Sequence, residues 1–188
     1  SVIGDGSGGM YLAWYDHRDV DTRGSDIYMH HLRPDGTPYP GWPENGLALD
    51  TSPYYEYGVT LAPDGRGGAY ATWISELYNG TPVRAQHLRG NAEPAPGWPE
   101  GGIWLGTSAG WSCSVISDGL GGAYVGMQTN YFSVGRLVPD GPVAAALGYI
   151  GCPESYSEPE RVYEQALVRG MDLETLTEWL AGRVSLDY

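Results

Sequence analysis

The carboxylates of this chain are densest in one segment, DHRDVDTRGSD, which spans residues 16–26. Several oxygen ligands close together suit a hard cation such as Ca²⁺, although the central Gly and the terminal Glu of an EF-hand loop are missing here. Arg18 and Arg23 could instead pair with the acids in a solvated loop, and we favour this second interpretation. The candidate ligands of a divalent metal such as Ca²⁺ are Asp16, Asp19, Asp21 and Asp26.

Cys113 offers a second kind of chemistry, that of a thiol nucleophile. Such a thiol needs a base beside it or a lowered pKa. The candidate bases are His17 and Glu56, but the sequence does not place either of them beside the sulfur. A buried, unreactive cysteine is the favoured alternative. The second cysteine is Cys152, and the two could pair or both be free.

Aromatic side chains cluster in the segments SPYYEYG, SAGWSCS and QTNYF. Tyr and Trp combine a flat apolar area with a polar tip, so they could form a stacking surface for a sugar or an aromatic ester. They could equally pack between neighbouring elements. The candidate ligand-binding residues are Tyr54, Tyr55, Tyr57, Trp111 and Tyr131, with Phe132 beside them.

The segments that should form the strands around these residues occur in three similar copies. The stretches SVIGDGSGGMYLAWYD, TLAPDGRGGAYATWIS and VISDGLGGAYVGMQT share an apolar run, the phrase Asp-Gly-x-Gly-Gly and a second apolar run. The second halves of the first two copies also align, which places His31 on His87 and Trp42 on Trp98 and favours structural roles for all four. The distance along the chain from one copy to the next is typical of repeat architectures. The three phrases begin at Asp5, Asp64 and Asp118.

Each copy is expected to form four short antiparallel strands, which is the plan of a β-propeller blade. In the second copy we expect strands over 58–63, 68–75, 83–89 and 102–107, with Asp-Gly-x-Gly-Gly as the tight turn between the first two. The fold class is therefore all-β, with three blades over about 1–52, 53–108 and 109–150. The repeated turns should lie at one end of the blades, and the loops that differ between copies at the other. Function tends to lie in such variable loops.

The hairpins of the first two copies match the pattern DGxGGxxxxW. In this they resemble the propeller repeats of bacterial secreted proteins and, distantly, the Asp-box turns of sialidases. The resemblance implies a propeller fold over residues 1 to about 147 and a secreted or periplasmic bacterial protein whose leader is not in this chain. The third copy, SDGLGGAYVG, departs from an Asp box in the position of its Ser and in lacking the Trp, so no sialidase catalytic residue can be carried over.

Three blades cannot close a ring, since known propellers use roughly four to eight. The first and third blades would each expose an apolar sheet face. A homodimer with six blades around one channel would cover both faces. The alternative is a fragment of a longer propeller. Residues 151–188 should form two short helices, because SEPERVYEQALVRG has a capping box and MDLETLTEWLAGRV carries an apolar stripe.

The net charge of −13 argues against nucleic acid as a partner, and no apolar stretch is long enough to span a membrane. Three functions remain. The first is a module that binds a small ligand or a glycan through its variable loops. The second is a metal- or thiol-dependent hydrolase of neutral esters, lactones or phosphotriesters. The third is a structural or assembly domain, because fold alone does not decide function.

Overall fold

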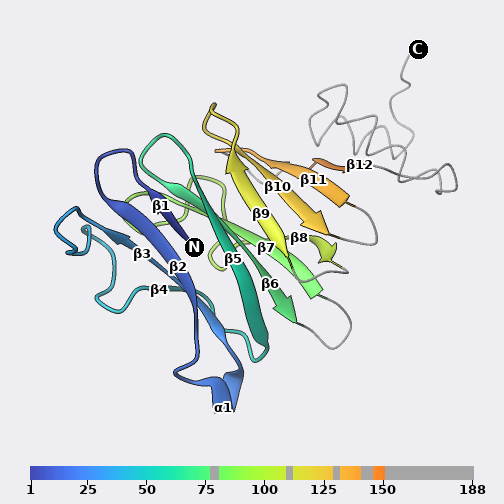
Figure 1. Ribbon diagram of the computed structural model, residues 1–188, viewed down its shortest axis with the longest axis horizontal. Coiled ribbons are helices and arrows are strands. Elements are labelled where there is room, and N and C mark those ends of the chain that lie inside the picture. Colours follow the sequence, from blue (N-terminus) through green and yellow to red (C-terminus); the bar gives the residue numbers. More distant parts are fainter. Residues whose placement is uncertain (77–80, 109–111, 129–131, 141–145, 151–188) are drawn as a thin grey trace, which may run out of the picture.

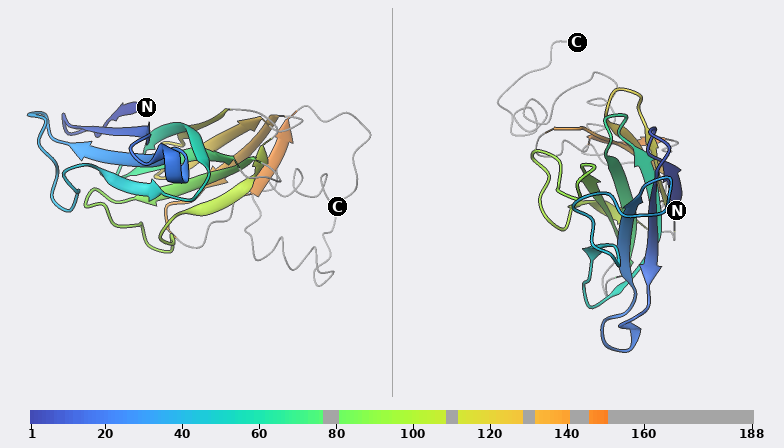
Figure 2. Two further views of the ribbon diagram at one scale, coloured as in Figure 1. Left: turned by 90° about the horizontal axis from the view of Figure 1, so that it is seen from below. Right: turned by 90° about the vertical axis from the view of Figure 1, so that its left-hand side faces the viewer.

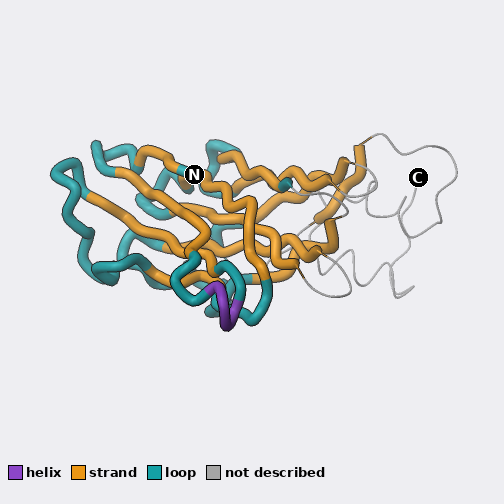
Figure 3. Tube along the Cα trace, turned by 60° about the horizontal axis from the view of Figure 1, so that its bottom comes forward, coloured by secondary structure: helices purple, strands orange, loops and turns teal. Residues whose placement is uncertain are grey.

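The computed structural model describes residues 1–76, 81–108, 112–128, 132–140 and 146–150. This part of the chain is almost entirely strand, with one short helix at an end of the strands (Figure 3). The first sheet contains β1 (Val2–Gly4), β2 (Met10–Asp16), β3 (Asp26–Leu32) and β4 (Leu47–Asp50). The second contains β5 (Tyr55–Pro63), β6 (Ala69–Glu76), β7 (Thr81–Leu88) and β8 (Ile103–Ser108). The third contains β9 (Cys113–Ser117), β10 (Ala123–Gln128), β11 (Phe132–Leu137) and β12 (Ala146–Ile150). The helix, α1 (Val20–Arg23), lies between β2 and β3.

Each repeat forms its own sheet of four strands, paired antiparallel in chain order. This confirms the all-β class predicted from the sequence. The strand bounds in the second repeat agree closely with expectation, except that β5 begins at Tyr55 instead of residue 58. The sheets follow one another along the long axis of the molecule (Figures 1 and 2). Within the described residues they form an open row and not a closed ring. The expected tail helices lie outside the described residues.

The three Asp-Gly-x-Gly-Gly turns have the same geometry. In the second turn, Asp64 Oδ1 accepts hydrogen bonds from the backbone N–H groups of Arg66 (2.7 Å) and Gly68 (2.8 Å). A Cβ atom at Gly68 would lie 2.4 Å from the carbonyl oxygen of Leu88, so the last position of the turn has room only for glycine. All three turns lie along the upper edge of Figure 1, and α1 lies at the lower edge.

Two apolar cores hold the row together, one between each pair of neighbouring sheets. The first includes Tyr11 and Met29 from the first sheet and Trp73 from the second, all completely buried. The second joins Tyr70 and Ile74 of the second sheet to the third sheet. A fully buried side chain of this size contributes roughly 2–3 kcal/mol, so these cores are a main source of stability. Stability therefore depends on contacts between consecutive sheets, as in other repeat proteins.

Candidate functional site

A tyrosine, a histidine and an aspartate recur together where one sheet packs against the next. We call each of these two places a joint: the first lies between the first and second sheets, and the second between the second and third. In the second sheet, Nε2 of His87 hydrogen-bonds to Oδ2 of Asp64 (3.0 Å), and its ring stacks on Tyr70 at 4.0 Å. Nδ1 of the same histidine lies 3.2 Å from the carbonyl oxygen of Pro139, on the third sheet's side of the joint. The Tyr70 hydroxyl donates to the carbonyl oxygen of Gly121 (2.8 Å). The histidine thus links its own turn to the neighbouring sheet.

The first sheet repeats this arrangement. His31 hydrogen-bonds to Asp5 (3.0 Å) and stacks on Tyr11 at 3.9 Å, while the Tyr11 hydroxyl donates to Gly67 of the second sheet (2.7 Å). Burial acts to raise the pKa of Asp5, but the hydrogen bonds from His31 and the turn hold it well below its usual range. This geometry supports the structural role that recurrence predicted for both histidines. His30 corresponds to Gln86 of the second sheet, because each side chain accepts the backbone N–H of the following histidine.

At the opposite end of the first joint, three buried carboxyl groups come together from different strands. Asp26 begins β3, Asp50 ends β4 and Glu56 lies near the start of β5. All three are less than a tenth exposed, and Glu56 is completely buried. Asp26 was predicted as a metal ligand and Glu56 as a base, and the electrostatics of Glu56 include both other acids. This carboxyl cluster lies at the end where the loops differ between repeats.

Glu56 has an unusual protonation state for a carboxyl group. Burial raises its pKa to about 8, and the neighbouring charges of Asp50 and Asp26 act in the same direction. Ser52 Oγ donates to its Oε1 (2.5 Å), while Oε2 is buried with no hydrogen-bond partner in the described part of the chain. A carboxyl group in this environment carries its proton at neutral pH, and it can then act as a hydrogen-bond donor.

The carboxyl group of Asp50, unlike that of Glu56, is surrounded by several hydrogen-bond donors. Its Oδ2 accepts from Trp73 Nε1 (2.9 Å) and from Ser75 Oγ (3.2 Å). Arg84 lies 3.3 Å from the same oxygen and pairs with it across the joint. These contacts tie the outer strand of the first sheet to the middle of the second. The carboxyl cluster therefore helps to hold the first two sheets together.

Cys113, the predicted thiol nucleophile, lies outside the carboxyl cluster. Cys113 begins β9 and is buried at the joint between the second and third sheets, where its Sγ lies 3.6 Å from the Gly58 carbonyl oxygen and 3.6 Å from Thr72 Oγ1. Burial raises the pKa of this thiol. Cys113 is a free cysteine, and Cys152 lies outside the described residues. The structure does not bring Cys113 together with Glu56, whose described contacts are in the carboxyl cluster, or with His17, whose ring contacts Tyr15.

We therefore expect Cys113 to react slowly with a thiol reagent in the native protein. A thiol with a raised pKa and little exposure offers little thiolate to the reagent. The measurement is the rate of modification by iodoacetamide at pH 8, resolved by peptide mass spectrometry so that Cys152 is counted separately. The rate at Cys113 should be at least ten-fold lower than in the denatured chain. Equal rates would contradict the buried placement.

The other predicted metal ligands follow one another from the end of β2 into α1. Asp16 forms a salt bridge to Arg18 (2.7 Å), as the solvated-loop interpretation expected, and also accepts from Trp14 Nε1 (3.0 Å). Asp19 occupies the N-cap position of α1 and Asp21 its first turn. Within the residues that the structure describes, no group of three or more His, Cys, Asp or Glu side chains is arranged to hold a metal ion.

The predicted aromatic surface is only partly described. Tyr55 is 54% exposed at the start of β5, whereas Tyr54 and Tyr57 are half-buried. Tyr57 packs against the core between the second and third sheets. Trp111 and Tyr131 lie outside the described residues. Among Tyr54, Tyr55 and Tyr57, the members of the set that the structure describes, Tyr55 is thus the one with an exposed ring at the variable end.

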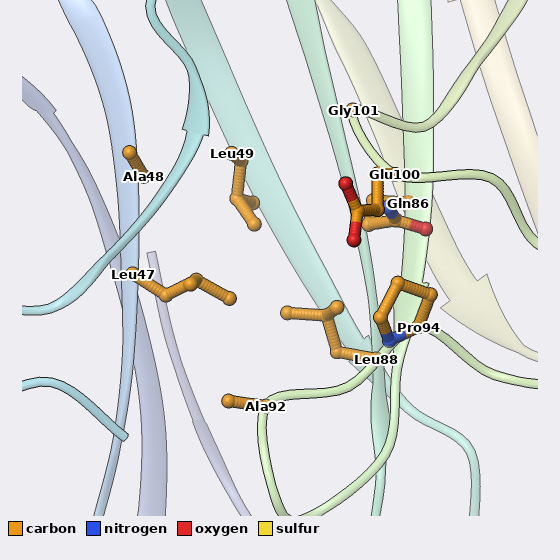
Figure 4. A pocket seen from close by; sticks show the side chains of 9 residues that line it. All are labelled: Leu47, Ala48, Leu49, Gln86, Leu88, Ala92, Pro94, Glu100 and Gly101. Atoms are coloured by element: carbon orange, nitrogen blue, oxygen red, sulfur yellow. The ribbon is translucent and has the colours of Figure 1, made fainter. Parts of the chain in front are cut away.

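A groove that the sequence did not reveal runs along the outer flank, between β4 and the second sheet, with a volume of about 330 Å³ (Figure 4). Leu47 and Leu88 point toward one another across it, and the carboxylate of Glu100 lies beside Gln86 on the side of the second sheet. Trp104 pairs with Arg84 across β7 and β8, so its ring lies on the face that also carries Gln86 and Leu88; it is 66% exposed. The lining residues are Leu47, Ala48, Leu49, Gln86, Leu88, Ala92, Pro94, Glu100 and Gly101.

The groove combines an apolar floor with a few polar groups and an exposed aromatic ring nearby, which is the usual make-up of a small-molecule site. Searches against protein-family models, curated proteins and solved structures found no match. None of the helices in the described part of the chain is long and apolar enough to cross a membrane.

Proposed function

We propose that this protein is a ligand-binding repeat module and that the flank groove is its binding site. The observation that carries the proposal is the groove itself, because its volume of about 330 Å³ reaches the range of small-ligand pockets, roughly 300–1,000 Å³. Its walls come from two sheets joined by a buried core, so the site is formed before a ligand arrives. A rigid site loses less conformational entropy on binding than a flexible one.

The ligand class follows from the lining and the charge. Leucine, alanine and proline side chains offer apolar surface, while Glu100 offers a hydrogen-bond acceptor at one side. The chain carries a net charge of −13, which disfavours anions. The indole of Trp104 on the same face can stack on the apolar side of a sugar ring. A neutral sugar or an amino sugar fits these features best.

Binding of neutral and amino sugars, measured by saturation-transfer NMR and calorimetry, tests the proposal. Leu47→Trp should fill the groove and weaken binding at least ten-fold, and Trp104→Ala should weaken it several-fold, because each changes the surface offered to the ligand. Tyr55→Ala is the matched control, since it removes an exposed aromatic ring at the variable end. If the control alone abolished binding, the variable loops would be the site. If no sugar bound, the binding function would be contradicted.

A hydrolase has less support from the described residues. The thiol of Cys113 has a raised pKa, and its contacts are a backbone carbonyl and a hydroxyl, neither of which is a general base.

We also propose that the three sheets are blades of a propeller and that a second copy completes a six-bladed ring. This is supported by the row of sheets, in which the first strands β1, β5 and β9 are neighbours across the joints. An assembly role is compatible with ligand binding, because the flank groove belongs to the joint between the first and second sheets.

A further inference from the structure

The two joints within the chain follow one rule. A tyrosine on the second strand of one sheet donates to the fourth residue of the next sheet's turn, as Tyr11 does to Gly67 (2.7 Å) and Tyr70 to Gly121 (2.8 Å). Both tyrosines are completely buried. The acceptor is a backbone carbonyl oxygen in each case, so every Asp-Gly-x-Gly-Gly turn can act as an acceptor.

The third sheet carries the same donor without a described acceptor on a following sheet. Tyr124 pairs with Arg136 across β10 and β11, as Tyr11 pairs with His31 and Tyr70 with His87. Arg136 occupies the histidine position and contacts Asp118 of its own turn (2.7 Å). Tyr124 is 43% exposed, and Ile116 opposite it is 64% exposed, although Ala62 at the same position of the second sheet is buried.

The first sheet carries the complementary acceptor. Gly8 is the fourth residue of its turn, as Gly67 and Gly121 are of theirs. Val2 is 66% exposed, whereas Leu61 and Val115 at the same position of the second and third sheets are buried. Met10 is also exposed, whereas its counterparts Ala69 and Ala123 have no exposed surface. Among the described residues, the first sheet thus has no neighbour on this face, whereas the corresponding faces of the second and third sheets each pack against the preceding sheet.

We propose that Tyr124 donates to the carbonyl oxygen of Gly8 in a second copy of this chain and that Ile116 packs there against Val2 and Met10. The inference deepens the six-bladed ring proposed above and rests on it. We infer that the partner is a second copy of this chain. The exposed positions of the first sheet correspond to those positions of the second and third sheets that pack against the tyrosine-bearing face of the preceding sheet. Twofold symmetry then gives two identical joints per dimer.

The test starts with the molecular mass measured by sedimentation velocity over a range of concentrations. The wild type should be a dimer of about twice the chain mass of 20.3 kDa. Ile116→Glu should be a monomer at concentrations where the wild type is a dimer, because it places a carboxylate in each joint. Tyr124→Phe should raise the dissociation constant on the order of ten-fold, since one hydrogen bond is lost from each of two joints. Tyr70→Phe is the matched control: it should lower the unfolding midpoint and leave the dimer intact.

Photo-cross-linking then localises the contact. Tyr124 is replaced by p-benzoylphenylalanine, and isotope-labelled chains are mixed with unlabelled chains to identify links between copies. The expected cross-link joins position 124 of one chain to the peptide that contains Gly8 of the other. A dimer that cross-links elsewhere, or that persists in Ile116→Glu, would overturn this joint and leave a dimer of another arrangement. A monomeric wild type would overturn both the joint and the ring, while sugar binding would still be judged by its own experiment.

Discussion

Asp64→Ala will lower the free energy of unfolding by about 3 kcal/mol, because it removes the acceptor of several buried donors. The turn N–H groups of Arg66 and Gly68 and the ring of His87 all hydrogen-bond to the Asp64 carboxylate. A donor left unsatisfied in a buried place costs about 1–3 kcal/mol. The measurement is urea denaturation followed by tryptophan fluorescence.

Two further variants show which contact matters. Asp64→Asn keeps an oxygen for the turn N–H groups and should cost less than alanine. Asp35→Ala removes a comparable bond, which the Thr37 N–H donates to Asp35 Oδ1 (2.9 Å), but in an exposed turn, so its effect should be a small fraction of that at Asp64. Equal losses at positions 35 and 64 would contradict the burial argument.

Raising the pH from 5 to 8 will destabilise the protein through Glu56. Its folded-state pKa of about 8 exceeds the ordinary value of 4.5, so over this interval the folded chain holds a proton that the unfolded chain has released. The contribution of this proton is fully present below pH 4.5 and is lost as the pH rises through 8. In the middle of the interval the slope from one such group is about 1 kcal/mol per pH unit.

Glu56→Gln isolates this effect. Glutamine has nearly the shape of the protonated side chain and does not ionise, so the variant should lose this component of the pH dependence and be more stable than the wild type at pH 8. Glu44→Gln, on an exposed loop, serves as the control and should keep the wild-type slope. Urea denaturation at half-unit steps between pH 5 and 9 provides the data. An unchanged slope in Glu56→Gln would show that the carboxyl is ionised in the folded protein.

The repeat made the fold predictable because it is local. Asp-Gly-x-Gly-Gly specifies a turn from its own residues, and the flanking apolar runs specify the strands that it joins. The early start of β5 was missed because Tyr55 and Glu56 pair with Glu76 and Ser75 across a register shift at Tyr57–Thr60. A break of that kind depends on the neighbouring strand, and the residues themselves carry no signal for it.

The candidate site was predictable only in part. Asp26 and Glu56 were chosen as chemistry-bearing residues, but Asp50 was not, since nothing in its own segment indicates that Trp73 and Arg84 would contact it. The recurrence of aspartate and histidine at matching positions was a signal for the pairs Asp5–His31 and Asp64–His87, although it did not indicate that the two side chains would be in contact. The flank groove lies between two repeats, so it depends on packing that no single repeat encodes.

The tyrosine bonds between sheets have an evolutionary consequence. Each acceptor is a main-chain carbonyl, so substitutions at the third residue of the turn leave the bond available; that residue is Ser7, Arg66 and Leu120 in the three copies. A duplicated repeat would already contain both partners of this bond, the tyrosine hydroxyl as donor and the turn carbonyl as acceptor. Copies could then be gained or lost without matched substitutions in their neighbours, and the number of units could change among descendants while the loops diverged independently.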